Sequence, residues 1–116
     1  MYTLLCYDKC TTCKKAIKFL DELGIEYVKR DIKSENPSLD ELKHILNLSG
    51  IEVNKLFNTS GQVYRQNNIK DKLKTMSDDE KLELLSSDGM LVKRPILFDE
   101  TIAIVGKKEE AYEELK

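Results

Sequence analysis

Cys10 and Cys13 form a Cys-x-x-Cys pair, the residues in this sequence whose type and spacing most directly suggest a chemistry. Two thiols one helical turn apart can close into a disulfide. A sulfur in the first turn of a helix also faces unpaired backbone N–H groups and the positive end of the helix dipole, which favour thiolate over thiol. Because Lys9 and Lys14 add positive charge, we predict that Cys10 is the nucleophile. Cys13, one turn later and on the inward face, is then the resolving thiol that attacks a mixed disulfide on Cys10.

Two other interpretations of the pair stay open: a chance pair without function, and half of a zinc site. A four-ligand zinc site needs two more Cys or His residues, and only Cys6 and His44 remain. Cys6 falls within an apolar run and is expected to be buried and inert. His44 lies in the middle of a predicted helix without an obvious carboxylate or thiol partner, so we expect a solvated surface residue. We therefore predict redox chemistry and no metal.

The elements around the pair must place it at the edge of a sheet. Residues 3–7 are apolar and β-prone, residues 11–23 follow an amphipathic helical pattern that Gly24 ends, and residues 25–31 predict a second strand. In a single sheet this order forms a right-handed parallel unit. The cysteines then follow the carboxyl end of the first strand, where α/β sheets place their chemistry.

The middle of the sequence is predicted to be helical and the end to return to strands. Capping boxes at residues 38–41 and 77–80 open two helices, which extend to about residue 50 and residue 85. Between them we expect a polar loop and a short helical stretch at residues 69–73. Strands are expected at residues 95–98 and 101–105, joined by a tight Asp99-Glu100 connection, before a charged helix at residues 107–115.

This order predicts an α/β protein with a thioredoxin-like fold, a mixed four-stranded sheet with an inserted helical subdomain at approximately residues 38–90. Other α/β arrangements fit the same elements. A chain of 116 residues is expected to form one domain, residues 1–116, and to bury a core without metal or disulfide staples.

Composition and charge exclude several classes of function. A formal net charge of −2, with lysines and glutamates interspersed, gives no electrostatic reason to bind nucleic acid or an anionic membrane. There is no signal-peptide pattern and no apolar run of membrane-spanning length. We expect a cytoplasmic protein in a reducing compartment, and nothing in the sequence requires more than a monomer.

Two further segments are candidates for the surroundings of the cysteines. Arg94-Pro95 precedes the last two predicted strands, where a proline is tolerated at a sheet edge. In a thioredoxin-like fold a proline here is cis and its loop packs beside the reactive cysteine, which would place Arg94 next to Cys10 as a cation. Residues 58–61, Asn-Thr-Ser-Gly, are either an ordinary turn or the lining of the cleft, and the sequence does not separate the two. Arg65 is expected to be an exposed cation.

These motifs, in this order, resemble the arsenate reductase (ArsC)/Spx family. The residues that carry the resemblance are 10–16 (CTTCKKA), 56–61 (LFNTSG), 64–65 (YR) and 93–96 (KRPI). The resemblance covers essentially the whole chain and implies a thioredoxin-like fold with an inserted helical subdomain. It also implies a nucleophilic cysteine in the first loop and a cis proline after an arginine, which by position are Cys10, Pro95 and Arg94.

The sequence departs from both branches of that family. Glutaredoxin-linked arsenate reductases use one cysteine in this loop and three arginines, whereas here Asn58 stands at the second arginine position and Lys107 near the third. A lysine is a point charge without the bidentate fork suited to an oxyanion, which argues against efficient arsenate reduction. Spx-type regulators have a Cys-x-x-Cys pair whose disulfide state tunes binding to the RNA polymerase α subunit. They usually lack the Asn-Thr-Ser-Gly loop and have a longer, basic C-terminus, while this sequence stops at Lys116, so we expect the reductase-like branch.

We therefore predict a cytoplasmic thiol–disulfide oxidoreductase, with an Spx-like regulator that binds the RNA polymerase α subunit and an arsenate reductase as alternatives. Its substrate would be an oxidised thiol or a small oxyanion. The residues expected to bind this substrate are Thr11, Thr12, Asn58, Pro95 and Lys107, with Arg94 beside the nucleophile. No tightly bound cofactor is expected, and an external thiol reductant, glutathione with glutaredoxin or thioredoxin, would reset the pair.

Overall fold

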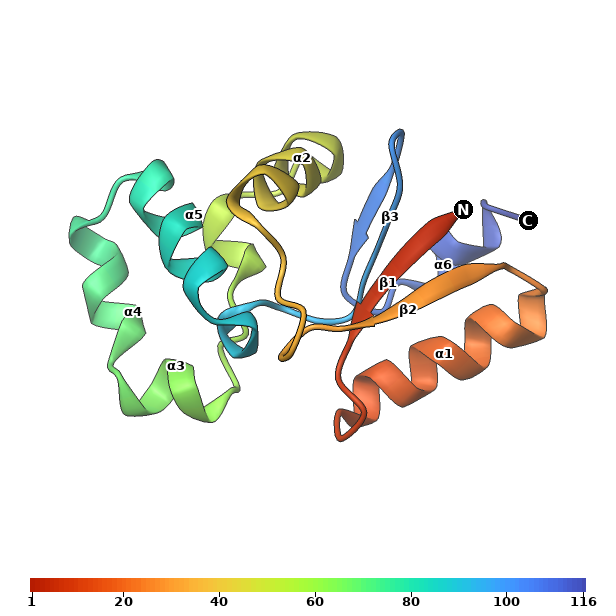
Figure 1. The fold of residues 1–116 in the computed structure, drawn as a ribbon, viewed down its shortest axis with the longest axis horizontal. Helices are drawn as coiled ribbons and strands as arrows, with labels where there is room; N and C mark the ends of the chain where they lie inside the picture. Colours follow the sequence, from red (N-terminus) through yellow and green to blue (C-terminus); the bar gives the residue numbers. More distant parts are fainter.

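Four short strands and six α-helices build the structure, a computed structural model that describes residues 1–116. The elements are β1 (Tyr2–Cys6), α1 (Thr11–Leu23), β2 (Tyr27–Asp31), α2 (Leu39–Ser49), α3 (Gln62–Gln66), α4 (Ile69–Lys72), α5 (Asp78–Ser87), β3 (Ile96–Phe98), β4 (Ala103–Val105) and α6 (Glu109–Glu113), with short 3₁₀ turns at Val53–Leu56, Leu73–Thr75 and Gly89–Leu91. The strands, α1 and α6 lie at one end of the molecule and α2 to α5 at the other (Figure 1). None of the helices combines the length and the apolar surface that a membrane crossing needs.

The sheet is mixed, with the strand order β2-β1-β3-β4. β1 and β2 are parallel, as the predicted strand–helix–strand unit requires, while β3 is antiparallel to β1 and β4 is antiparallel to β3. In this register Leu4 of β1 lies opposite Lys29 on one side and Leu97 on the other. The loop that carries Cys10 therefore leaves the carboxyl end of a central strand.

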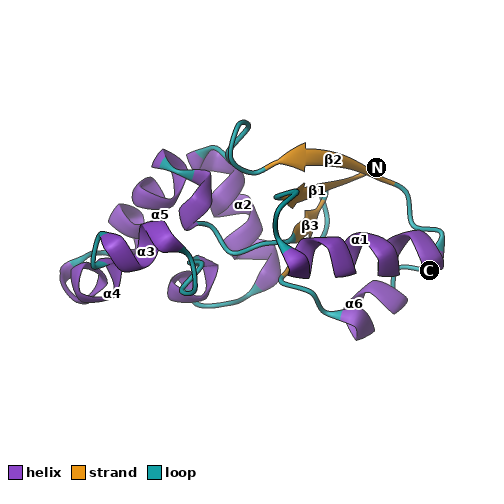
Figure 2. Cartoon of the chain, turned by 90° about the horizontal axis from the view of Figure 1, so that it is seen from below, coloured by secondary structure: helices purple, strands orange, loops and turns teal.

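Successive residues of β1 point to opposite faces of the sheet and contribute to two separate clusters of buried side chains. Leu4 and Cys6 pack with residues of α1 and with Tyr112 of α6. Leu5 belongs to the larger cluster, which includes side chains of α2, α4 and α5. Figure 2 shows α1 and α6 together on one side of the strands. The prediction that Cys6 is buried is confirmed.

Several helix ends lie where the sequence signals placed them. The Ser38 hydroxyl accepts the backbone N–H of Glu41, whose carboxylate accepts the N–H of Ser38, and the same reciprocal bonds join Ser77 and Glu80 before α5. α1 ends at Gly24, where φ is 74° in the left-handed region that favours glycine. Both predicted capping boxes are confirmed.

Arg30 on β2 fastens the turn that leads from the sheet into α2. Its Nη1 and Nη2 donate to the two carboxylate oxygens of Glu41 at 2.6 and 2.9 Å. Its Nε donates to the carbonyl oxygen of Glu35 at 2.9 Å, and Nη2 also donates to that of Asn36 at 3.1 Å. The hydrogen bonds from Arg30 are the largest cause of a Glu41 pKa of about 2, well below the ordinary carboxyl value.

The structure corrects three expectations. The last hairpin is joined by residues 99–102 rather than by a tight Asp99-Glu100 turn, because the Asp99 carboxylate accepts the N–H groups of Thr101 and Ile102 and stabilises a wider loop. α3 forms in a segment predicted as a polar loop. His44 is half-buried, and its Nε2 lies 2.8 Å from the Asp99 carbonyl oxygen, so the prediction of a solvated histidine is wrong. A backbone carbonyl 55 residues away leaves no signature in the sequence near a histidine.

Candidate active site

Cys10 occupies the N-cap position of α1, directly after the loop that leaves β1. Its backbone N–H donates to the Tyr7 carbonyl oxygen at 2.9 Å, and its own carbonyl accepts the N–H of Lys14 at 3.1 Å. These two bonds fix the loop and the first turn of the helix around the sulfur. The side chain is half-buried, so the thiol is held in place and still open to a cavity.

The surroundings of Cys10 lower the pKa of its thiol. Partial burial is the largest single influence and acts upward, but the backbone N–H and the thiol of Cys13 and the guanidinium of Arg94 together outweigh it. The predicted cations Lys9 and Lys14 are exposed. The stabilisation of a thiolate therefore comes from the start of the helix and from an arginine 84 positions later in the sequence, by its numbering.

Cys13 lies one turn further along α1 and is buried in the cluster beneath it. Burial is the main reason that its pKa rises to about 12, and the neighbouring Cys10 raises it further. The backbone N–H of Tyr7 lies 3.4 Å from the Cys13 sulfur and acts in the opposite direction. The pKa values of the two thiols are therefore displaced in opposite directions, so Cys10 loses its proton more readily than Cys13 does.

Arg94 reaches the cysteines from the segment before β3. The Arg94–Pro95 peptide bond is cis, and Pro95 is buried. The guanidinium carbon lies 5.3 Å from the centre of the Tyr7 ring, a cation–π arrangement. Nε and Nη1 of Arg94 are buried and have no hydrogen-bond partner. The guanidinium is thus positioned by an aromatic ring and keeps unused hydrogen-bonding capacity near Cys10.

The Asn58-to-Gly61 loop lies beside Arg94 because the segment that leads into the loop pairs with the segment that precedes Arg94. Phe57 forms an isolated antiparallel bridge with Val92, and the Asn58 N–H donates to the Leu91 carbonyl at 2.8 Å. Within the loop a Cβ at Gly61 would lie only 2.7 Å from the Asn58 side-chain nitrogen, so a larger residue there would require the Asn58 amide to shift. The Asn58 side-chain oxygen accepts the Ser60 hydroxyl at 3.2 Å, and Asn58 lines the cavity.

These elements enclose one cavity of about 290 Å³ over the Cys10 thiol. It is lined by Cys10, Thr12, Phe57, Asn58, Thr59, Ser60, Gly61, Lys93, Arg94, Gly106 and Lys107. Three of these side chains are cations and none is a carboxylate. Such a lining favours an anionic occupant next to the Cys10 sulfur.

The predicted site residues do not all reach this cavity. Cys10, Thr12, Asn58, Arg94 and Lys107 line it. Cys13 and Pro95 are buried outside the lining, while Thr11 and Arg65 are exposed and also outside it. No three His, Cys, Asp or Glu side chains are grouped closely enough to hold a metal ion.

Lys93 is a lining residue to which sequence reasoning assigned no role. Its backbone N–H donates to the Leu56 carbonyl at 2.7 Å, which brings this segment alongside the Asn58-to-Gly61 loop. The only sequence signal was its position directly before Arg94. Nothing near residue 93 in the sequence indicates the pairing with residue 56.

Comparisons with known proteins agree with this architecture. A model of the ArsC family matches residues 5–115. The chain is 50% identical over 112 residues to the uncharacterized protein YusI of Bacillus subtilis, covering 97% of this chain and 95% of YusI. It is 34% identical over 110 residues to the global transcriptional regulator Spx of Listeria innocua, covering 95% and 82% of the two chains. The solved structure of an ArsC family related protein from Bacteroides fragilis superimposes with a TM-score of 0.96 at 46% identity, over 99% of this chain and 97% of that one. The predicted α/β, thioredoxin-like fold is confirmed.

Proposed function

We propose, from the premise that this chain belongs to the ArsC family, that it is a thiol–disulfide oxidoreductase with Cys10 as the nucleophile and Cys13 as the resolving thiol. The observation that carries the proposal is the opposite displacement of the two thiol pKa values, lowered at Cys10 and raised at Cys13, within one helical turn. Groups with pKa values pushed apart in this way are suited to different steps of one reaction. The cationic cavity over Cys10 supplies a place for the substrate.

In the first step the Cys10 thiolate attacks one sulfur of a substrate disulfide. A bond forms between that sulfur and the Cys10 sulfur, the substrate S–S bond breaks, and the second substrate sulfur leaves as a thiolate. In the second step Cys13 attacks the Cys10 sulfur of the mixed disulfide and displaces the remaining substrate thiolate. The substrate gains two electrons, and the protein is left with a Cys10–Cys13 disulfide.

The high pKa of Cys13 fits this order of events. While Cys10 is a thiolate, its charge and the hydrogen bond between the two thiols add to the effect of burial and keep the proton on Cys13. When Cys10 forms a mixed disulfide, its negative charge is lost and no longer raises the pKa of Cys13. The Tyr7 N–H still donates to the Cys13 sulfur and lowers that pKa. The departing substrate thiolate is the group available to accept the Cys13 proton.

The surroundings of the cavity define the expected substrate and context. Three cations and no carboxylate favour a disulfide, or another oxidised thiol, that carries a negative charge close to its reacting sulfur. A dithiol or monothiol reductant from outside the protein, glutathione with glutaredoxin or thioredoxin, must return the Cys10–Cys13 disulfide to two thiols. Since this cycle needs a reducing supply, we place the protein in the cytoplasm and expect no tightly bound cofactor.

The experiment that tests the proposal is turnover of a model disulfide in the presence of a thioredoxin or a glutaredoxin reducing system, followed by NADPH consumption. We expect Cys10→Ser to abolish turnover. Cys13→Ser should instead trap a mixed disulfide between Cys10 and the substrate, visible as a mass increase under non-reducing conditions. Wild-type protein that shows no turnover with either system, together with a Cys13→Ser variant that traps nothing, would refute the proposal.

A second candidate function is supported by the 34% identity to a global transcriptional regulator over nearly the whole chain. In this alternative the same cysteine pair is a redox sensor, and its oxidation changes affinity for the RNA polymerase α subunit. Binding to the C-terminal domain of that subunit, measured with reduced and with oxidised protein, separates the two. Redox-dependent binding without disulfide turnover would favour the sensor.

Arsenate reduction is the third candidate, and the cationic lining of the cavity is the observation in its favour. Only one of the three cations is a guanidinium, so a bidentate grip on an oxyanion is available from Arg94 alone. Arsenate-dependent NADPH consumption in the same coupled assay tests it. We expect a rate well below that with a disulfide.

A further inference from the structure

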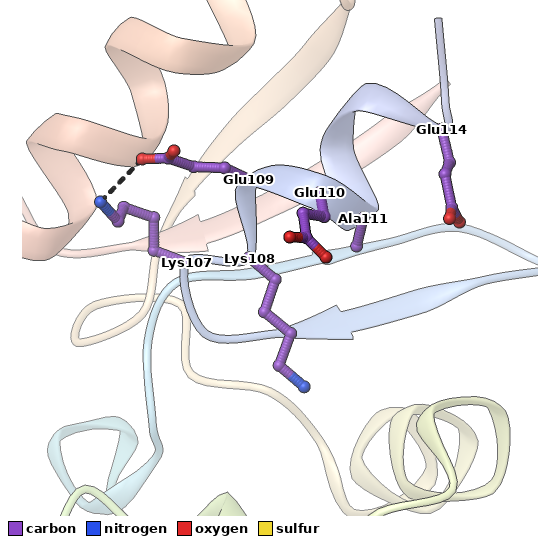
Figure 3. Close-up of a pocket in the computed structure, with 6 residues that line it drawn as sticks. All are labelled: Lys107, Lys108, Glu109, Glu110, Ala111 and Glu114. Atoms are coloured by element: carbon purple, nitrogen blue, oxygen red, sulfur yellow. Dashed lines mark hydrogen bonds and ion pairs between the residues drawn. The ribbon is translucent and has the colours of Figure 1, made fainter.

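Lys107 is shared between the cavity over Cys10 and the start of α6. Its Nζ lies 3.0 Å from Oε1 of Glu109, which belongs to the first turn of that helix. In Figure 3 the Lys107 and Glu109 side chains point toward one another, whereas those of Lys108 and Glu110 project elsewhere. The Lys107 side chain is 29% exposed and that of Glu109 is 52% exposed. Glu109 itself lies outside the lining of the Cys10 cavity.

This ion pair changes the charge available to a substrate. Lys93, Arg94 and Lys107 are the cations of the cavity, and Glu109 compensates the last of them. Lys93 and Arg94 are then the two cations of the lining without a paired carboxylate, and a Cys10 thiolate would offset one of these two charges. The cavity that results is suited to an occupant with a single negative charge and less suited to one with two.

We propose that Glu109 is a specificity-determining residue, which pairs with Lys107 and thereby favours disulfides carrying one carboxylate near the reacting sulfur over dianionic oxyanions. The proposal rests on the assignment of Cys10 as the nucleophile in the proposed function. The pair is partly exposed, and exposed ion pairs are weak, so its effect on a ligand is moderate and adjustable. Removing the carboxylate should release Lys107 toward the cavity and make the site accept a dianion.

Alkylation of Cys10 by two haloacetyl reagents of nearly equal size measures the charge at the sulfur directly. In each reaction the thiolate sulfur forms a bond to the reagent carbon and iodide leaves. Iodoacetamide is neutral and iodoacetate carries one negative charge, so the ratio of their rates cancels the thiolate fraction and reports attraction of an anion. The Cys13→Ser background confines the reaction to Cys10, since the remaining Cys6 is buried.

We expect Glu109→Gln to raise the iodoacetate-to-iodoacetamide rate ratio by about two- to fivefold, the range that an exposed ion pair supports. Glu110→Gln is the matched control, since it removes the same charge one residue later, outside the ion pair, and should change the ratio much less. Lys107→Met should lower the ratio, and adding Glu109→Gln to it should have little further effect. Equal effects of the Glu109 and Glu110 variants, or a Glu109 effect that persists without Lys107, would overturn the inference.

Sulfate gives the second readout, because it is a dianion that does not react with thiols. Its protection of Cys10 from iodoacetamide should require about four- to twenty-fivefold less sulfate in Glu109→Gln than in the wild type, because a dianion carries twice the charge of iodoacetate and its fold-change is therefore the square of the monoanion's. Unchanged protection would contradict the inference even if the rate ratio shifts. A Cys10 that reacts with neither reagent would refute the proposed function, whereas a reactive Cys10 with an unaltered ratio refutes only the role of Glu109.

Discussion

Two half-buried arginines, Arg30 and Arg94, show how the same side chain serves different purposes in this molecule. All three guanidinium nitrogens of Arg30 have protein acceptors, including both carboxylate oxygens of Glu41. Arg94 forms no ion pair with a carboxylate, and its buried Nε and Nη1 have no acceptor. Arg30 is therefore fully engaged in holding the turn between the sheet and α2, while Arg94 keeps its charge available for Cys10.

Hydrogen-bond satisfaction, more than residue type or burial, distinguishes these two arginines. A buried donor without an acceptor costs free energy, and such a cost is tolerated where the group serves a site. The Tyr7 ring under the Arg94 guanidinium offsets part of it without neutralising the charge.

The largest effect on stability is expected from Arg30→Met. The change removes a bidentate bond to Glu41 and two bonds to backbone carbonyls, and we expect a loss of about 2–3 kcal/mol in the free energy of unfolding. Urea unfolding followed by circular dichroism measures it. Arg94→Met is the matched variant and should lose much less stability, because the buried Nε and Nη1 of Arg94 have no acceptor to lose; a loss as large as that of Arg30→Met would erase the distinction.

For the reactivity of Cys10, the larger effect is expected from Arg94→Met and the smaller from Arg30→Met. Arg94→Met should move the pH dependence of Cys10 alkylation by iodoacetamide toward higher pH, since removing a nearby cation raises the pKa of a thiol. Arg30→Met should leave that dependence unchanged. If the midpoint of the Arg94 variant coincides with that of the wild type, Arg94 does not act on the thiolate.

The Arg30 region should also show a characteristic acid sensitivity. The pKa of Glu41 is about 2 in the folded protein and near 4.3 when unfolded, so its ionisation stabilises the fold above about pH 4.3. This stabilisation is lost as the pH falls from about 4.3 toward 2. Urea unfolding at pH 7, 4 and 3 should show the gap between wild type and Glu41→Gln narrowing with acid. A constant gap would mean that the carboxylate charge contributes nothing.

The smallest effect concerns His44, which joins α2 to the loop after β3 by a single hydrogen bond. His44→Ala should cost about 1 kcal/mol in the free energy of unfolding and leave Cys10 alkylation unaltered. Lys43→Ala, one residue earlier and exposed, is the control and should be nearly neutral. Equal stability of the two variants would show that the His44 bond does not form in solution.

Local signals in the sequence predicted most of the fold. Both capping boxes and Gly24 act within four residues, and the β1–α1–β2 unit follows from the change of the apolar pattern from strand to helix and back to strand. The Cys10 position at a helix start follows from the same local pattern. Helix caps and helix starts join residues that are close in the sequence, so the residue types in a short segment are enough to predict them.

The parts that escaped prediction depend on partners distant in sequence. His44 bonds to a carbonyl 55 residues away, and Lys93 reaches the cavity through a backbone bond to residue 56. The residues next to Arg94 in the sequence carry no sign that it lies near Cys10. That position was expected only from the topology and the family resemblance. The Lys107–Glu109 pair is local, yet only the folded cavity shows that it changes the charge offered to a ligand.

Tyr7 contacts both Arg94 and Cys13, each through a different part of the residue. Its ring lies under the Arg94 guanidinium, and its backbone N–H points to the Cys13 sulfur. A shift of this single loop residue would displace the cation and the second thiol at the same time. Engineering that seeks to retune one of them by reshaping the β1–α1 loop will therefore retune the other, and variants that act on either alone must be sought at positions 13 and 94 themselves.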